Sequence, residues 1–251
     1  MRKSRLIGST TLVGLLAVPP AFAADLAPVK YQESQKLLWS GFYVGANAGF
    51  ARSADPRIDC LGFGGPCGTA FPAPKADGAE FGLQAGYNWQ VGNFVVGLEA
   101  DINKLAAEGM TSFSGIDPAK GPDQLSSRYD WLGTARGRVG VTAGSALFYA
   151  TGGFAYGRVG HNYIYGTGSP ANTQAFGLAE NRTGWTVGGG AEYALDQNWS
   201  VKGEYLYVHL AGSNLDISSL QANFGPNPPG TNFLRYRNDL NIARVGVNYR
   251  F

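Results

Sequence analysis

Acidic and basic residues spaced two apart are the strongest chemical feature of this 251-residue sequence. Residues two apart share one face of a β-strand, so such pairs would project from several strands into one interior. A set of this kind could be an acid–base site or an ion path, or it could pair internally to fill a narrow space. Balanced charge favours internal pairing, because unpaired buried charges are costly. The set comprises Glu99, Asp101, Arg136, Arg138, Glu192, Lys202, Glu204 and Arg244.

Residues for nucleophilic catalysis are sparse. His161 and His209 are the two histidines, and Ser126 and Ser213 are nominal nucleophiles, but no spacing ties either serine to a histidine with an orienting acid. We therefore predict no catalytic residue and no cofactor, and the chain is not expected to be an enzyme.

Cys60 and Cys67 are the only cysteines. In an oxidising compartment, a short loop-closing disulfide is the natural interpretation of two such residues. Metal binding would need further ligands, and the surrounding segment contains no histidine. We expect a disulfide and no metal site.

The charged pairs lie on segments in which apolar and polar or glycine residues alternate. A period of two over about ten residues, repeated eight times, is typical of a transmembrane β-barrel. The fifth segment is the least clear, because both of its faces are small or aromatic. The segments cover residues 42–50, 79–90, 94–103, 129–141, 147–159, 185–195, 199–207 and 243–251.

Short and long connections alternate between these segments. The short turns lie at 91–93, 143–146 and 196–198, and the long connections span about 52–78, 107–127, 160–180 and 212–235. Outer-membrane barrels show this order, with short periplasmic turns and long external loops. We predict an all-β fold, an eight-stranded antiparallel transmembrane β-barrel with up-and-down meander topology.

Aromatic residues on the apolar face gather near the segment ends, as expected for interfacial girdles. At the end with the short turns they are Phe42, Trp89, Phe94, Trp199 and Tyr249. At the end with the long connections they are Tyr129 and Trp131.

The N-terminus is typical of a secretory signal peptide. Bases at Arg2, Lys3 and Arg5 precede an apolar stretch, and Ala21–Ala23 provides a small-x-small cleavage pattern. We predict a signal peptide over 1–23, a short periplasmic segment over 24–38 and the barrel domain over 39–251. Cleavage removes three of the 20 bases, which leaves 17 against 18 acids, and this charge argues against nucleic acid as a partner.

The last residues place Val247, Tyr249 and Phe251 on the apolar face. This ending resembles the terminal aromatic pattern by which barrel-assembly machinery recognises its substrates, so that machinery is an expected partner during biogenesis.

Several strings closely resemble the small outer-membrane proteins of alphaproteobacteria, a family variously called porin-family, major surface antigen or hemin-binding proteins. The resemblance implies an eight-stranded barrel in contact with outer-membrane lipid and lipopolysaccharide, surface exposure and a role in envelope integrity. Some relatives bind hemin, which would involve the external loops. The strings are Ala24–Pro28, Trp39–Phe50, Trp131–Gly140, Tyr149–Gly153, Ala155–Gly157, Trp199–Tyr207 and Arg244–Phe251.

Three functions follow from these observations. The leading one is a structural barrel that supports envelope integrity and presents surface loops. The second is a surface protein that binds hemin or a host through those loops. The third is a narrow ion-conducting porin, although an eight-stranded lumen is small enough for side chains to fill.

Overall fold

The computed structural model describes residues 39–61, 71–114, 118–168, 173–220 and 232–251. The predicted signal peptide and the segment 24–38 lie outside these residues and stay predictions. No helix in the described part of the chain is long and apolar enough to cross a membrane. The described elements are β1 (Gly41–Ser53), β2 (Ile58–Leu61), β3 (Asp77–Val91), β4 (Phe94–Phe113), the 3₁₀ helix η1 (Pro118–Lys120), β5 (Asp123–Ala143), β6 (Ala146–Tyr165), β7 (Gln174–Ala194), β8 (Trp199–Asp216) and β9 (Phe233–Arg250).

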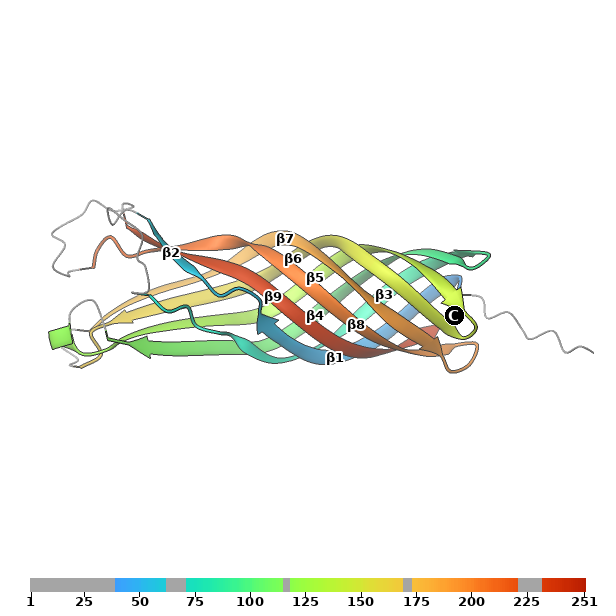
Figure 1. The fold of residues 1–251 in the computed structure, drawn as a ribbon, viewed down its shortest axis with the longest axis horizontal. Helices are drawn as coiled ribbons and strands as arrows, with labels where there is room; N and C mark the ends of the chain where they lie inside the picture. The colour runs from blue at the N-terminus through green and yellow to red at the C-terminus, as the bar shows by residue number, and fades with distance from the viewer. Residues whose placement is uncertain (1–38, 62–70, 115–117, 169–172, 221–231) are drawn as a thin grey trace, which may run out of the picture. The chain divides into compact units, whose positions relative to one another are not determined.

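Eight of these strands form a closed ring (Figure 1). Each long strand pairs antiparallel with the next along the chain, and β1 closes the ring against β9 from Tyr43↔Arg250 to Ser53↔Leu240. Closure pairs the backbone groups of both edge strands, which a membrane-spanning sheet requires because lipid offers no hydrogen bonds. The ring confirms the predicted eight-stranded meander.

The short turns also agree with the sequence. The β3–β4 and β5–β6 connections are two-residue loops that contain Gly92 and Gly144, with φ of 63° and 60°. Glycine adopts this left-handed conformation without strain, and such loops match the twist of the flanking strands. At the β7–β8 turn, Asp196 Oδ1 accepts hydrogen bonds from the backbone N–H groups of Asn198 and Trp199, at 2.8 and 2.7 Å.

The strands continue well beyond the limits that the alternation predicts. Strands extend into each of the predicted long connections 107–127, 160–180 and 212–235: β4 runs to Phe113, β5 begins at Asp123, β6 runs to Tyr165, β7 begins at Gln174, and β8 runs to Asp216. Apolar alternation marks only the part of a strand whose outer face meets lipid. Where that face turns polar, the backbone ladder continues without the sequence signal.

One short strand interrupts the first long connection. β2 pairs with β9 from Ile58↔Tyr236 to Leu61↔Phe233, at the end of the barrel where the long connections lie (Figure 1). Cys60 lies on β2, and Cys67 lies outside the described residues. The predicted disulfide between them stays a prediction.

A β-bulge overturns the predicted position of Tyr129. The β5–β6 register shifts between Tyr129 and Trp131, so Asp130 is an extra residue and the two rings point to opposite sides of the wall. Tyr129 is buried in the lumen, whereas Trp131 packs on the outer face against Tyr156, with ring centroids 5.2 Å apart. The outer aromatic girdle therefore contains Trp131 without Tyr129.

The depth of an outward residue can be tested on β7. Val187 lies on the lipid-facing wall, half exposed, and Asn181 lies on the same face of the same strand, six residues nearer the loop end. Val187→Arg should cost about 2–4 kcal/mol of unfolding free energy, and Asn181→Arg about 0–1 kcal/mol, because the charge penalty falls towards the interface. Urea unfolding in lipid bilayers measures both. Equal costs would contradict this placement of the membrane.

Candidate functional site

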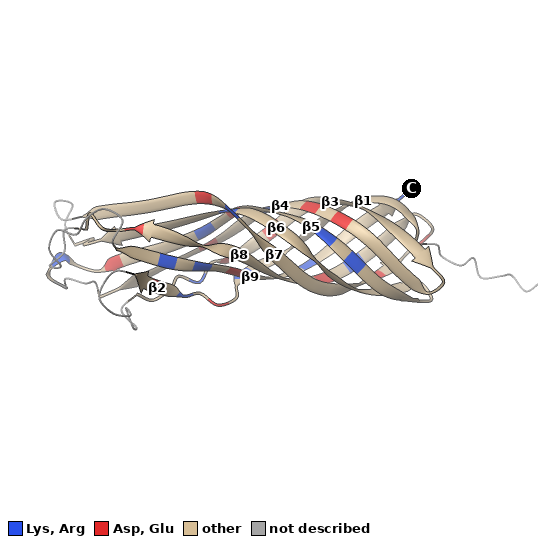
Figure 2. Ribbon diagram, turned by 90° about the horizontal axis from the view of Figure 1, so that it is seen from above, with Lys and Arg blue, Asp and Glu red and all other residues tan. Residues whose placement is uncertain are grey.

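The eight predicted interior charges come together inside the barrel. They project from β4, β5, β7, β8 and β9, and their side chains are at most 4% exposed. Figure 2 shows charged positions of both signs in the half of the barrel that ends in the short turns. We call this set the charge network: Glu99, Asp101, Arg136, Arg138, Glu192, Lys202, Glu204 and Arg244.

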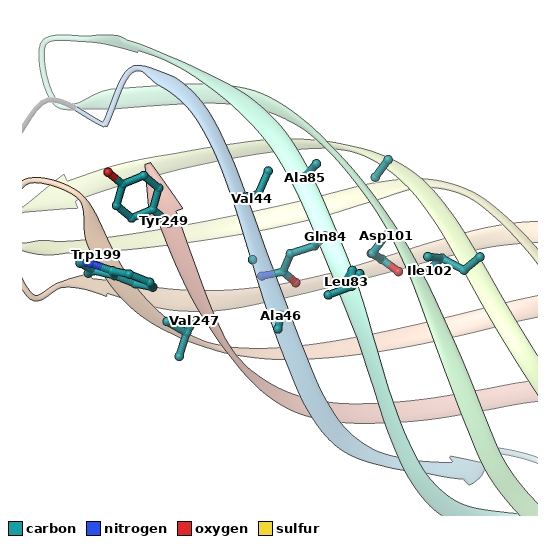
Figure 3. A pocket seen from close by; sticks show the side chains of 12 residues that line it. Val44, Ala46, Leu83, Gln84, Ala85, Asp101, Ile102, Trp199, Val247 and Tyr249 are labelled. Atoms are coloured by element: carbon teal, nitrogen blue, oxygen red, sulfur yellow. The ribbon is translucent and has the colours of Figure 1, made fainter. Parts of the chain in front are cut away.

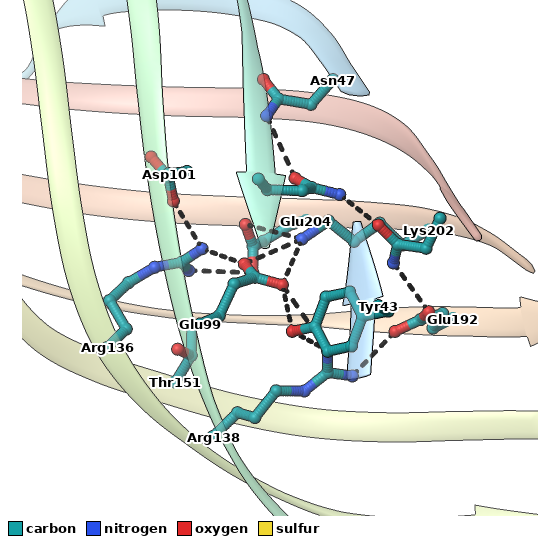
Figure 4. Close-up of polar contacts among 12 residues, drawn as sticks. Tyr43, Asn47, Glu99, Asp101, Arg136, Arg138, Thr151, Glu192, Lys202 and Glu204 are labelled. Carbon is teal, nitrogen blue, oxygen red and sulfur yellow. Dashed lines mark hydrogen bonds and ion pairs between the residues drawn. The ribbon is translucent and has the colours of Figure 1, made fainter. Parts of the chain in front are cut away.

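Arg136 is the hub of the network (Figure 4). Its Nη1 donates to Glu204 Oε1 at 2.9 Å, and its Nη2 reaches both Glu99 Oε1, at 2.5 Å, and Asp101 Oδ2, at 3.0 Å. Its Nε donates to the Thr134 hydroxyl, which in turn donates to Asp101. One guanidinium therefore joins acids from β4 and β8 across the lumen, a geometry suited to the fork of donors that arginine carries.

The other three bases complete the pairing. Arg138 Nη2 donates to Glu192 Oε2 at 2.8 Å, and Lys202 Nζ lies 2.9 Å from both oxygens of Glu99. Arg244 donates to Glu204 Oε2 at 2.6 Å. Lys202 lies directly opposite Glu192 in the β7–β8 ladder, yet its ammonium contacts Glu99 on the far wall. Pairing runs across the lumen as well as between neighbouring strands.

Two tyrosines that sequence reasoning missed also belong to the site. Tyr43 Oη donates to Glu99 Oε2 at 2.7 Å, and Tyr149 Oη donates to Glu204 Oε1 at 3.1 Å. Arg138 packs its guanidinium 4.2 Å from the centre of the Tyr149 ring. Room for these rings comes from glycine, because a Cβ at Gly86 would lie 2.4 Å from the Tyr43 side chain. The period-two alternation places Tyr43 on the inward face, which was the signal available in the sequence. In β6 the two faces carry similar residue types, so alternation alone does not assign Tyr149 to the lumen.

Glu80 is a further buried acid that the predicted network lacks. It is 1% exposed, and neither of its carboxylate oxygens has a hydrogen-bond partner among the described residues. Since the other four acids already match four bases, Glu80 stands outside the charge balance.

Apolar layers enclose the network on both sides. Towards the short turns, Trp39 covers the lumen with Val95, Leu147 and Ala194, and the Arg250 guanidinium lies 5.1 Å from the centre of the Trp39 ring. Towards the long connections, the next inward positions form an apolar layer: Ala51, Ala76, Leu105, Ala107, Tyr129, Leu132, Ala155, Val159, Leu206, Val208, Leu210, Leu240 and Ile242. Ion pairs held between such layers have little access to water.

Beyond that apolar layer, the fold brings Ser127, His161 and Asn238 together. His161 was expected in a loop, but it lies buried on β6, where Ser127 Oγ is 2.9 Å from its Nδ1 and Asn238 Oδ1 is 2.9 Å from its Nε2. Because Asn238 Nδ2 donates to Ala211 O, its Oδ1 accepts from Nε2–H, so Nδ1 accepts the Ser127 proton. The order nucleophile–base–orienter resembles a hydrolase triad.

The triad has little space on its inner side, and the outer hollow of about 380 Å³ that Ser127 borders is lined by neither His161 nor Asn238. The Tyr236 ring stacks on the His161 ring at 4.0 Å, and the lumen-side hollow beside Ser127 holds about 10 Å³, roughly the space of one water. Neither predicted serine contacts a histidine: Ser126 accepts from Asn162, and Ser213 accepts from Asn238. The three groups satisfy one another as a buried polar layer. Among the described residues, no group of three or more His, Cys, Asp or Glu side chains could hold a metal.

Two large hollows lie on the lipid-facing wall. One of about 820 Å³ crosses β1, β3 and β4 where Ala46, Ala85 and Ala100 stand between larger residues (Figure 3). Trp199 and Tyr249 border it near the short turns. A hollow in this position faces acyl chains, so it is no candidate for a water-soluble ligand. Val247 and Tyr249 of the predicted assembly signal line this hollow, and the Phe251 ring lies 5.2 Å from the Tyr249 ring, measured between centroids. Recognition of these three residues by assembly machinery stays a prediction.

Paired and unpaired interior acids should respond oppositely to neutralisation. Glu204→Gln leaves excess positive charge beside Arg136, Lys202 and Arg244 and should lower the unfolding free energy by about 3–5 kcal/mol. Glu80→Gln, an equivalent change without ion-pair partners, should be neutral or stabilising. Denaturant unfolding of the refolded barrel measures both variants. If Glu80→Gln proved as harmful as Glu204→Gln, our account of the charge balance would be wrong.

Acid should loosen the loop end of the barrel. Burial lowers the pKa of His161 from 6.5 to about 4, so the unfolded segment takes up a proton at a higher pH than the folded one. The stabilisation is complete above pH 6.5 and is lost as pH falls towards 4, by about 3 kcal/mol. Hydrogen-exchange protection of residues 159–163, corrected for intrinsic rates, should fall roughly hundredfold over this range.

His161→Phe provides the control, because it cannot titrate. Its protection should be lower at neutral pH, where Ser127 and Asn238 lose a partner, but it should depend less on pH. If the hydrogen-exchange protection of the parent and of His161→Phe depended equally on pH, the prediction for His161 would be wrong, and the pH effect would come from nearby carboxylates.

Comparison with known proteins matches this architecture. The pattern of the outer membrane protein beta-barrel domain family covers residues 9–227. The 31 kDa outer-membrane immunogenic protein of Brucella melitensis is 35% identical over 223 residues, 85% of this chain and 84% of that protein. The 22 kDa outer membrane protein of Rhizobium leguminosarum bv. viciae is 31% identical over 230 residues, 91% and 83% of the two chains.

Among solved structures, the outer membrane protein OprG of Pseudomonas aeruginosa shares the fold, with a TM-score of 0.52 and 15% identity over 84% of this chain and 96% of that one. A closed eight-stranded ring, an apolar outer wall and relatives of known location together place the protein in the outer membrane. The chain belongs to the outer membrane protein beta-barrel domain family.

Proposed function

We propose that this protein is a non-conducting structural barrel that supports the integrity of the outer membrane and presents its long connections at the cell surface. The observation that carries this is the filled lumen. The eight charges of the network are paired, their side chains are nearly inaccessible, and apolar layers lie on either side of them.

Ion conduction is a poor fit to this interior. A conducting pore needs water or exchangeable ligands along its length, and here an ion would have to displace paired charges and pass a layer of aliphatic side chains. A further cluster nearer the loop end, built on Leu125, Tyr163, Leu215 and Tyr236, adds another apolar layer. The filled lumen thus favours a structural role over the porin role.

Surface display is supported by relatives. The matched Brucella protein is named as immunogenic, which is consistent with exposure of part of that protein outside the cell. Binding of hemin or a host would depend on the connections, of which residues 62–70, 115–117, 169–172 and 221–231 lie outside the described range. Buried His161 is inaccessible to an external ligand.

Conductance and detergent resistance test the proposed function together. The refolded protein in planar bilayers should show no steady current, whereas Arg136→Ala with Arg138→Ala removes two of the four bases and should admit water and ions. Deletion of the gene should sensitise cells to detergent, with recovery on complementation by the parent. Steady nanosiemens conductance from the parent, or unchanged detergent resistance on deletion, would contradict the proposed role.

A further inference from the structure

A row of alternating aromatic and cationic or polar side chains crosses the outer wall where the apolar surface ends. Ladder pairing aligns Phe81 with Lys104, Lys104 with Trp131, Trp131 with Arg158, and Arg158 with Asn181. On β4, the residue before Lys104 on this face is Ile102, which is 61% exposed in the apolar band. The row thus marks the boundary between acyl chains and headgroups at the loop end.

Two cations flank one indole in this row. Lys104 and Arg158 lie two strands apart with Trp131 between them, a spacing of about 10 Å. Among the described residues, Lys104 has no ion pair. Arg158 shares Asp130, at the bulge, with Arg128, at 3.5 and 3.6 Å, so one acid serves two bases. Glu108 lies opposite Arg128 in the β4–β5 ladder, further towards the loop end. At the level of the row itself, the two cations Lys104 and Arg158 therefore outnumber the single acid Asp130.

A hollow lies on the same face just beyond the row. It has a volume of about 380 Å³, and its lining includes Met110, Ser126, Arg128 and Asn162. The carboxylate of Glu108 also lines this hollow. Hydroxyl, amide, carboxylate and guanidinium groups beside one apolar side chain suit a sugar ring, which presents both hydroxyls and a C–H face.

We propose that the outward face of β4, β5 and β6 at this boundary binds lipid A, the phosphorylated glycolipid of the outer leaflet. Lys104 and Arg158 contact its phosphates, the wall around Trp131 and Tyr156 contacts the upper acyl chains, and the hollow beside Arg128 receives sugar. Lipid A with two phosphates is the expected ligand because the site has two separated cations, Lys104 and Arg158, each of which can contact one phosphate. The proposed binding rests on the outer-membrane location and is independent of the proposed envelope role.

Binding of defined lipids to the refolded protein tests the site. Protein refolded from urea into detergent, free of bound lipid, is titrated with bisphosphorylated lipid A and followed by native mass spectrometry. Lys104→Gln with Arg158→Gln should weaken binding about 10- to 30-fold, since each surface cation contributes roughly 1 kcal/mol near anionic lipid. Lys104→Arg should retain binding. Heat-dependent gel mobility verifies that each variant is folded.

Arg235→Gln with Arg237→Gln is the matched control. Both arginines lie exposed on β9, away from the row, and their removal changes the net charge equally. Binding by this control should equal that of the parent. If the Lys104 and Arg158 pair fails to fold, each single substitution should weaken binding several-fold. Unchanged affinity in the row variants, or equal affinity for dephosphorylated lipid A or phosphatidylglycerol, would overturn the site, while conductance and detergent resistance test the envelope role separately.

Discussion

An eight-stranded ring encloses an interior so narrow that inward side chains from opposite walls must pack against each other. Most of the organisation of this protein follows from that constraint. A charge on one wall cannot reach water, so it needs a counter-charge on another wall, and Arg136 joins acids from β4 and β8 for this reason. A large ring also needs an empty position on the neighbouring strand, and Gly86, the ladder partner of Tyr43, leaves that space. The lumen is a core whose pairs are ionic in one layer and apolar in the next.

The layered interior explains how a polar core can be closed to solvent. Buried ion pairs are weak evidence for stability, because desolvation offsets much of their attraction. Here the ion pairs matter more for specifying one register. Each base contacts a defined set of acids, and a one-residue slip of any strand would turn its charges towards lipid. The apolar layer beside the network keeps water from competing for those pairs. The same buried ion pairs, shielded by the apolar layer, thus both close the lumen to solvent and specify the strand register.

The outer wall changes from apolar to polar along its length, whereas the inner wall remains packed beyond the membrane. Through the membrane, outward residues are apolar, and beyond the row of Lys104, Trp131 and Arg158 they include charges and amides. The inward positions there are still buried on β6 and half-buried at the end of β4 and on β7. The strands therefore carry their lumen contacts, including the buried layer of Ser127, His161 and Asn238, past the membrane surface. A protein with this plan presents a rigid, headgroup-facing belt below its surface connections.

The sequence alone determined the ring, the short turns and the eight members of the charge network, because a period of two assigns each residue to lipid or lumen wherever the outer face is apolar. The sequence could not determine where the strands end outside the membrane. There the outward residues are polar, so the alternation of apolar and polar residues disappears while the backbone pairing continues. Nor could the sequence locate the bulge at Asp130, which changes parity without a sequence mark and moves Tyr129 inside. Partners across the lumen, such as Lys202 with Glu99 and Ser127 with His161, depend on the register and curvature of the closed ring. Alternation within a strand specifies the side of the wall that a residue faces, and only closure of the barrel specifies which residue it meets there.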